Sequence, residues 1–250
     1  MNSYKIYKNC ITKKSSKDFF KFVVNLIDSY EKDFGTSSHF SNWDDLNFSK
    51  KLVKLRKKKE IFSAIYNSLF KSNELQKIVF NNNLHKLAGN FLNVDETQLT
   101  IRSITFRMDP PNDKRNLYGW HQDSAYDKFN FYSKNGAILW IPLIDTTKKN
   151  GTLMIKEGSE DSNYNCSKVF KKRTNLHSKK ILVQKKYLKK YKSKHISVKK
   201  NNALVTYNGL FHKSGTNTSK KFRFTIVIRY GNLFAKDFIY RRNLKTSSIL

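Results

Sequence analysis

Apolar residues recur with a helical spacing over the first ninety or so residues. In the segment 16–34 they occupy positions 19, 20, 22, 23, 24, 26 and 27, followed by Tyr30, which predicts an amphipathic helix capped by Ser15 or Ser16. The segments 45–71 and 74–92 follow the same spacing. One stripe of the first comprises Leu46, Leu52, Leu55, Ile61, Ile65 and Leu69. The pattern predicts a mostly helical region over residues 1–95.

Beyond this region the apolar positions form short runs that are rich in β-branched and aromatic residues, which are typical of strands. The expected strands are 98–108, 136–144, 151–156, 203–208 and 222–230. Turn sequences such as Asp109-Pro110-Pro111 and Lys149-Asn150-Gly151 separate them. Many short strands with polar turns predict a sandwich or jelly-roll barrel. The expected fold class is α+β with a mainly β core and N-terminal helices packed on it.

The chain of 250 residues suits one structural domain overall. We expect a helical region at 1–95, a barrel at 96–235 and a C-terminal tail at 236–250. Within the barrel, the Lys-rich segment 160–201 is expected to be an exposed insertion. It contains one weaker strand candidate, ILVQKKYL at 181–188.

Composition places the chain among globular proteins, with 38% apolar and 14% aromatic residues. It has no run of about 18 apolar residues, which predicts no membrane span. The opening segment lacks the apolar stretch of a secretory signal. Cys10 and Cys166 lack the spacing of a metal site. We interpret them as reduced thiols of a cytoplasmic protein.

The chain carries 49 Lys and Arg against 19 Asp and Glu, a net charge of +30. Such a charge would attract nucleic acid, anionic membranes or phosphorylated substrates. Only nine of the 49 are Arg, however, which is the residue favoured for reading bases and pairing with phosphate. A compositional bias with a solvated basic surface therefore remains an alternative, and the stretch 171–201 is open to the same two interpretations.

The stretch YGWHQDSAY at 118–126 places His121 and Asp123 two residues apart among aromatic residues. On a strand, both would face one side while Gln122 faced the other. Alone, the pair favours a buried histidine with a carboxylate partner over half of a metal site. A second histidine, His212, follows the expected strand 203–208 and is itself followed by Ser214 and Arg223.

Two histidines and one carboxylate form the facial triad typical of non-haem Fe(II) oxygenases. Three protein ligands leave three positions open, two for a 2-oxo acid and one for O₂. The far carboxylate of the 2-oxo acid needs a buried cation. Arg223 suits this role because its planar fork pairs bidentately with carboxylates, and Thr225 on the same side offers a hydroxyl.

Three segments carry a resemblance to a known family: WHQDSAY (120–126), LWIPLIDTTKKNGTLMIKEGS (139–159) and YNGLFHKSGTNTSKKFRFTIVIRY (207–230). The sequence resembles the phytanoyl-CoA dioxygenase family of Fe(II)/2-oxoglutarate oxygenases, with its His-x-Ser pair and its eleven-residue step from His212 to Arg223. The resemblance implies a double-stranded β-helix. It also implies an iron site of His121, Asp123 and His212, and a 2-oxoglutarate site that includes Arg223, Ser214 and Trp140.

The expected function is a dioxygenase that uses Fe(II), 2-oxoglutarate and O₂ to hydroxylate an unactivated C–H bond, releasing succinate and CO₂. The presence of Asp123 favours hydroxylation, since related halogenases replace this carboxylate. Glu160 departs from the family, which usually has His at this position after the Gly-Ser pair. The substrate, a small or carrier-linked molecule with anionic compounds among the candidates, does not follow from the family.

Two other functions remain possible from the sequence. Arg223 and Arg229 form the Arg-x5-Arg pair of alkylated nucleic-acid demethylases, although these usually have a longer step from the second histidine. The other is a non-catalytic basic binding module on a relict barrel.

Several single residues stay open as well. Arg107 suits either an ion pair in the barrel or substrate contact, Trp140 is either core or pocket wall, and Tyr126 and Phe129 suit either the substrate mouth or the core. The remaining histidines are interpreted as surface or capping residues: His39, His85, His177 and His195.

Overall fold

The structure is a computed structural model of the chain and describes residues 2–32, 34–113, 117–125, 133–161, 166–169, 180–236 and 238. Its α-helices are α1 (Lys13–Tyr30), α2 (Leu46–Leu55), α3 (Lys59–Lys71), α4 (Asn73–Val79), α5 (Asn82–Leu92) and α6 (Lys185–Leu188). Its strands are β1 (Tyr4–Tyr7), β2 (Leu99–Asp109), β3 (Gly136–Pro142), β4 (Leu153–Lys156), β5 (Cys166–Val169), β6 (Lys180–Val183), β7 (Ser193–Ile196), β8 (Ala203–Tyr207), β9 (Phe211–Ser214) and β10 (Arg223–Asn232).

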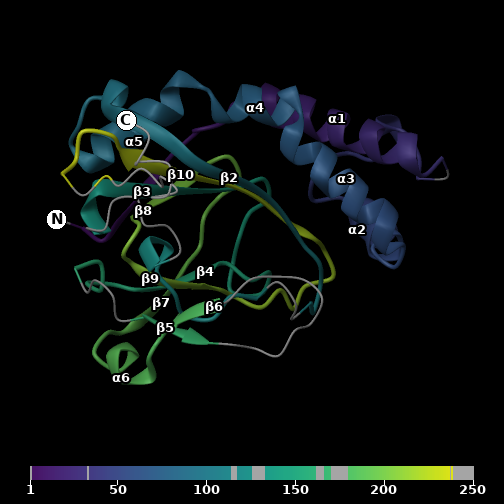
Figure 1. Cartoon of the computed structure of the whole chain (residues 1–250). Helices are drawn as coiled ribbons and strands as arrows, with labels where there is room; N and C mark the ends of the chain where they lie inside the picture. Colours follow the sequence, from purple (N-terminus) through teal and green to yellow (C-terminus); the bar gives the residue numbers. More distant parts are fainter. Residues whose placement is uncertain are drawn as a thin grey trace, which may run out of the picture.

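Two antiparallel sheets form the core of the fold (Figure 1). The larger sheet has five strands in the order β1-β8-β3-β10-β2, and the smaller has three in the order β7-β4-β9. Side chains from both sheets pack into one inner cluster that includes Trp140 and Val227 from the larger sheet and Ile155 and Ile196 from the smaller. This arrangement confirms the predicted α+β class with a jelly-roll barrel.

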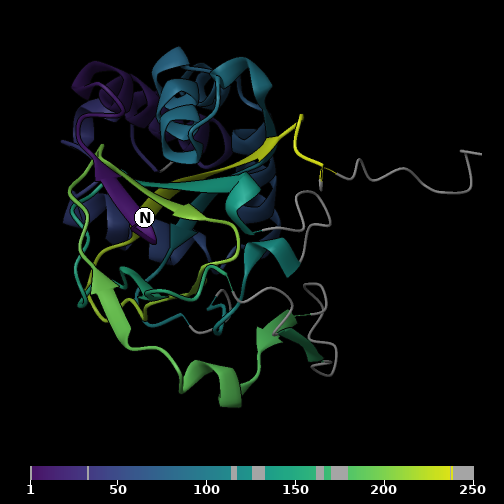
Figure 2. The same cartoon turned by 90° about the vertical axis from the view of Figure 1, so that its left-hand side faces the viewer.

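The larger sheet separates two apolar clusters because successive residues of a strand point to opposite faces. On β10, for example, Phe224, Ile226 and Ile228 point outward into the cluster beneath the helices, whereas Val227 belongs to the inner cluster. The helices α1–α5 lie over this outer face (Figure 2). The inner face is thereby left to line the space between the two sheets.

Aromatic rings join the helices to the sheet. Phe19 of α1 meets Phe106 of β2 edge-on at a centroid distance of 5.3 Å. Trp43, in the loop before α2, lies 4.9 Å from Phe224 of β10, and its indole N–H donates to the carbonyl of Ser16 at 3.1 Å. Large aromatic side chains give much buried apolar area at each contact, so the helical layer holds the outer face of β10 firmly.

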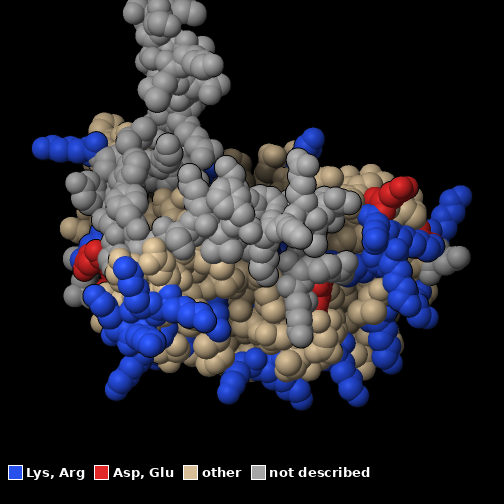
Figure 3. Space-filling model, turned by 60° about the horizontal axis from the view of Figure 1, so that its bottom comes forward, with Lys and Arg blue, Asp and Glu red and all other residues tan. Residues whose placement is uncertain are grey.

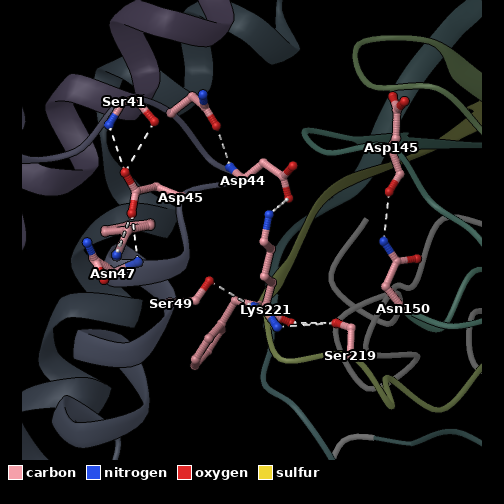
Figure 4. A network of polar contacts seen from close by, with 12 residues as sticks. Ser41, Asp44, Asp45, Asn47, Ser49, Asp145, Asn150, Ser219 and Lys221 are labelled. Atoms are coloured by element: carbon pink, nitrogen blue, oxygen red, sulfur yellow. Dashed lines mark hydrogen bonds and ion pairs between the residues drawn. The ribbon is translucent and has the colours of Figure 1, made fainter.

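A polar network fixes the start of α2 against the segment before β10 (Figure 4). The carboxylate of Asp45 accepts from the backbone N–H groups of Asn47 and Phe48 at 2.7 and 3.0 Å, as expected of a helix N-cap. One turn later, Ser49 Oγ accepts from the N–H of Phe222 at 3.1 Å. Phe222 precedes Arg223, so the helical layer sets where β10 begins.

The N-terminal prediction requires three corrections. The region is not helical from the start, because Tyr4–Tyr7 forms β1 and pairs with β8 at the edge of the larger sheet. The cap of α1 is Thr12, whose side chain accepts from the N–H of Ser15, rather than Ser15 or Ser16. The single stripe predicted over 45–71 is divided into α2 and α3 at residues 56–58.

The predicted insertion 160–201 extends too far, because its last part belongs to the barrel. β7 pairs with β4 along its whole length, and Ile196 and Val198 are buried in the inner cluster, so this part belongs to the barrel. The weak strand candidate at 181–188 is divided between the end of β6 and α6. Most of the predicted tail 236–250 lies outside the described residues. The division into regions and the single domain stay predictions.

Within the described ranges, no helix combines the length and the apolar character needed to cross a membrane.

Asp45→Ala should destabilise the protein by about 1 kcal/mol, because it removes the acceptor for two N–H groups at the start of α2. Asp44→Ala is the matched control, since the side chain of Asp44 makes an exposed ion pair with Lys221 and its loss should cost less than about 0.5 kcal/mol. Urea unfolding of the two variants measures the difference. Equal losses would contradict the capping role.

Candidate metal centre

His121 and His212 meet through the backbone. Each donates its N–H to the carbonyl of the other, and both N–O distances are 3.0 Å. His212 belongs to β9 of the smaller sheet, whereas His121 forms an isolated bridge outside the named strands. This pairing places the two imidazoles with their ring centroids 4.1 Å apart.

Asp123 lies beside the two histidines, but the local backbone is not the strand that was predicted. It begins a short 3-10 helix, Asp123–Ala125, and does not lie on a strand with His121. Gln122 nevertheless turns away, donating its side-chain amide to the carbonyl of Gly209 at 2.7 Å. Strand alternation was therefore the wrong reason, although the side chains of His121 and Asp123 do converge.

Both histidines present the same ring nitrogen to Asp123. The Nδ1 atoms of His121 and His212 lie 2.8 and 2.9 Å from the carbonyl oxygens of Gly119 and Leu210. A carbonyl only accepts, so each Nδ1 carries the proton and each Nε2 keeps a lone pair. These Nε2 atoms lie 3.3 and 3.6 Å from Asp123 Oδ1. Burial and the neighbouring His121 lower the pKa of His212 to about 4, which keeps its ring neutral.

Arg229 of β10 holds the other oxygen of this carboxylate. Its Nε donates to Asp123 Oδ2 at 2.5 Å, and its Nη1 donates to Thr105 Oγ1 at 3.2 Å. Burial alone would raise the pKa of Asp123, but the charge of Arg229 holds it well below its usual range. The carboxylate is therefore ionised, with Oδ1 left between the two histidines.

These three residues have the donor set of a transition-metal site. Their ligand atoms all lie within 4.8 Å of one another, and all three side chains are buried. Two imidazoles and one carboxylate on one side of an ion match the facial triad that binds Fe(II). The carbonyl partners of both Nδ1 atoms supply the orientation that such ligands need. The residues present therefore fit an iron ion.

A cavity of ≈ 510 Å³ opens beside the triad between the two sheets. The larger sheet contributes the inner faces of β2, β3, β8 and β10, and the smaller contributes β4 and β9. Among the predicted residues, Ser214 and Trp140 line it with the triad. Trp140 is thus a wall residue as well as part of the inner apolar cluster. Glu160 is not part of this lining and accepts a hydrogen bond from Ser3 at 2.9 Å.

A network of the half-buried Arg107 with the buried Asp109 and Arg223 lies along β2 and β10. Asp109 accepts from Arg107 Nε and Nη2 at 3.1 and 2.8 Å and from Arg223 Nη2 at 2.6 Å. Burial would raise the pKa of Asp109, but the two guanidinium groups hold it far below its usual value. Arg107 therefore makes the predicted ion pair and also lines the cavity, whereas its contact with the substrate stays a prediction.

Arg223 keeps unused hydrogen-bonding capacity in this network. Its Nε and Nη1 are buried and have no hydrogen-bond partner among the described residues, and the same holds for Thr225 Oγ1 on the same face of β10. Buried polar groups in proteins almost always have a hydrogen-bond partner, so these unpaired donors indicate a missing acceptor. A carboxylate placed here would satisfy them, which fits the far end of a 2-oxo acid. Trp140 faces the same guanidinium, 5.9 Å from its Cζ.

Two residues of the site were missed by the sequence reasoning. Asp109 was assigned only to a turn, although it ends β2 and pairs with Arg223 across the sheet. Arg229 was considered only as part of an Arg-x5-Arg pair, and its contact with Asp123 joins segments far apart in the chain. Neither contact leaves a signal in local spacing.

The other predicted residues divide into those within and those outside the described ranges. His39 bonds Thr36 at the surface, His85 packs against Tyr230, and His195 is exposed on β7. His177, Tyr126 and Phe129 lie outside the described residues.

Comparison with known proteins identifies the family. The profile of the phytanoyl-CoA dioxygenase (PhyH) family matches residues 36–225, more than half of the chain. The chain therefore belongs to this family. Membership confirms the predicted enzyme class, a non-haem iron enzyme that depends on 2-oxoglutarate, and with it the predicted cofactors. The comparison with curated proteins found no match to this sequence.

Solved structures of low identity share the fold. The epimerase SnoN from nogalamycin biosynthesis, in complex with Fe3+, alpha ketoglutarate and nogalamycin RO, has a TM-score of 0.61 at 10% identity, covering 92% of this chain and 79% of SnoN. The non-heme monooxygenase ThoJ has a TM-score of 0.58 at 17% identity, covering 92% and 74%. AviO1 from Streptomyces viridochromogenes Tue57 has a TM-score of 0.50 at 20% identity, covering 67% of this chain, which spans 65% of AviO1. At these identities the likeness concerns the fold.

Asp109→Asn should destabilise the protein by about 3 kcal/mol, because it leaves the buried Arg223 and the half-buried Arg107 without their shared carboxylate. The pKa of Asp109 is lower in the folded chain than in the unfolded chain, so its stabilisation is complete above about pH 4 and is lost as the pH falls further. The variant should thus lose less stability than the wild type between about pH 4 and pH 2.

Urea unfolding at a series of pH values measures this difference. Asp161→Asn is the control, because Asp161 pairs with Lys134 at the surface and should cost less than about 1 kcal/mol. Parallel pH profiles of Asp109→Asn and the wild type would contradict the assignment.

Proposed function

We propose that this protein is an Fe(II)- and 2-oxoglutarate-dependent dioxygenase that hydroxylates an unactivated C–H bond of a small or carrier-linked substrate. The observation that carries the proposal is the convergence of two Nε2 atoms and one carboxylate oxygen on one point beside a cavity. His121, Asp123 and His212 are the metal ligands in this proposal. When bound, iron and 2-oxoglutarate would supply the oxidant, with O₂ consumed and succinate and CO₂ released.

The protein's own part is to fix ligands and exclude water. The carbonyls of Gly119 and Leu210 hold the protons of both imidazoles away from the metal side. Arg229 binds one carboxylate oxygen of Asp123, so the other points to the metal. Ligands fixed in this way need no reorganisation when the metal arrives, which favours one coordination geometry.

Arg223 and Thr225 hold the far carboxylate of 2-oxoglutarate in this proposal, through the orphaned donors of the guanidinium and the free hydroxyl. Ser214 and Trp140 form the wall beside it. The row Arg223, Thr225, Val227 and Arg229 shares one face of β10 by strand alternation. One strand therefore carries both the anchor of the cosubstrate and the residue that orients Asp123.

His212→Ala should abolish the substrate-independent turnover of 2-oxoglutarate, because two remaining ligands cannot hold the metal in an open triad. Succinate release under Fe(II), 2-oxoglutarate and air measures this turnover. His195→Ala is the matched control, since His195 is exposed on β7 at the other edge of the smaller sheet and should leave turnover unchanged. Undiminished turnover in His212→Ala would overturn the triad assignment.

Arg223→Lys should raise the 2-oxoglutarate concentration needed for half-maximal turnover by about one to two orders of magnitude. A charged hydrogen bond is worth roughly 1.5–3 kcal/mol, and lysine cannot reproduce the planar fork. The maximal rate should change much less, because the metal ligands are intact. An unchanged requirement for 2-oxoglutarate would remove Arg223 from this role.

A further inference from the structure

Arg229 uses only part of its guanidinium to hold Asp123. Its Nε donates to Asp123 Oδ2 at 2.5 Å, and its Nη1 donates to Thr105 Oγ1 at 3.2 Å and to Ser103 Oγ at 3.5 Å. Among the described residues, Nη2 of Arg229 has no acceptor. A guanidinium carries its N–H donors in a fixed planar fork, so the donors of Nη2 stay available beside the contact with Asp123.

The available donors of Arg229 face the cavity. β10 lies between β3 and β2, so no sheet edge adjoins Arg229. Alternation along β10 sends Ile228 and Tyr230 into the cluster beneath the helices and Arg229 to the other face. The side chain of Arg229 is 25% exposed and lines the cavity, and it does not border the hollow outside β2 that Phe80 and His85 line. Its exposed part therefore belongs to the cavity.

Thr105 adds a hydroxyl donor to the same wall. It stands opposite Val227, so both side chains share the inner face, and it lines the cavity. Its oxygen accepts from Arg229, and no described residue accepts its hydrogen. A hydroxyl that accepts one hydrogen bond still has one to donate. Arg229 and Thr105 thus present neighbouring donors that need an acceptor.

Apolar side chains adjoin these donors. Ile138 stands opposite Arg229 on β3, Val227 precedes it on the same face of β10, and Leu153 comes from the smaller sheet. All three line the cavity and belong to the inner apolar cluster. Small-molecule sites commonly combine an apolar lining with a few fixed polar groups that orient the ligand. A molecule in this cavity therefore meets an apolar wall and, next to the triad, a pair of donors.

The pairing of Arg229 with Asp123 selects the kind of acceptor. The carboxylate of Asp123 already matches the charge of this guanidinium. A second carboxylate on Nη2 would lie beside the first, and two carboxylates that share one site repel each other. A carbonyl or hydroxyl oxygen accepts a hydrogen bond without adding charge. The donors of Arg229 and Thr105 therefore favour a neutral oxygen.

We infer that Nη2 of Arg229 and the hydroxyl of Thr105 bind a carbonyl or hydroxyl oxygen of the primary substrate, whose apolar body lies against Ile138, Val227 and Leu153. The inference rests on the proposed function and names a substrate class for the same cavity. Because Nε of the same guanidinium binds Asp123, this contact places the substrate oxygen beside a metal ligand. Arg229 is then both a positioning residue for Asp123 and a substrate-binding residue.

Probes that share one six-membered ring test this contact. They are cyclohexanone, methylenecyclohexane, which lacks the oxygen, and cyclohexanecarboxylate, which adds a charge. Mn(II) replaces iron at the triad in the presence of 2-oxoglutarate without O₂, and its paramagnetism shortens the relaxation of the ¹H nuclei of a probe held in the cavity. Titration of each probe gives its dissociation constant. The wild type should bind cyclohexanone about tenfold more tightly than methylenecyclohexane, because only the ketone accepts hydrogen bonds.

Thr105→Val should reduce this preference for the ketone about threefold, because it removes one donor and keeps a side chain of similar shape. Arg229→Lys should abolish the preference, because an ammonium that binds Asp123 cannot present the second edge of a planar fork. Binding of methylenecyclohexane should stay unchanged in Thr105→Val, which reports an intact cavity. Thr100→Val is the matched control, since Thr100 lies on the same strand but borders the outer hollow and not the cavity.

A preference for cyclohexanone that is the same in both variants as in the wild type means that the ketone binds the metal or another surface, and it overturns the inference. Tighter binding of cyclohexanecarboxylate than of cyclohexanone, lost in Arg229→Lys, overturns the neutral acceptor and with it the substrate class.

Electron paramagnetic resonance of Mn(II) separates the two proposals. A wild-type protein that binds no Mn(II) contradicts the proposed function. Mn(II) binding without a preference for the ketone that depends on Arg229 and Thr105 contradicts only this inference.

Discussion

The antiparallel contact between His121 and His212 is the interaction on which the site depends. Its two backbone hydrogen bonds join a loop after β2 to a strand of the smaller sheet, and they bring two imidazoles within 4.1 Å. They set the register of the segment after Gly119 against β9, and the hydrogen bond from Gln122 to Gly209 supports the same position. Each ring is then locked by a carbonyl two residues earlier in its own chain segment, so one local geometry is used twice.

The larger sheet shows how one strand serves both stability and chemistry. The outward residues of β10 pack under the helices, and Phe222 just before it is hydrogen-bonded to Ser49 of α2.

The basic net charge lies mostly on the protein surface: Lys and Arg side chains outnumber acidic ones on the face at the bottom of Figure 1 (Figure 3). The arginines of the inner face are instead buried or half-buried and bonded to carboxylates. Surface charge and site charge are thus separate features of this protein.

The sequence was sufficient for the fold class, most strands of the larger sheet and the residues of the triad. Alternation of apolar residues reports which face of a strand is buried, and the family motifs cover the strands near the site. It was not sufficient for β1, β7 and β9, whose sequences YKIY, SKHI and FHKS contain no run of apolar residues, whereas the equally short β4 was predicted from its run Leu153–Ile155. The contacts of Asp109 and Arg229 depend on register between distant strands. Register is fixed by packing of the whole sheet and leaves no local pattern.

The arrangement of Asp109 bears on how a second carboxylate could bind Arg223. A guanidinium has five N–H donors, and Asp109 engages only Nη2 of Arg223, so the Nε and Nη1 donors stay available on another edge of the fork. Two carboxylates beside one arginine would repel each other strongly in a buried site. Arg107 offsets this, because its bidentate contact gives Asp109 a cation of its own. The network therefore carries one positive charge more than it needs for Asp109 alone, and it reaches balance only when a second carboxylate is bound.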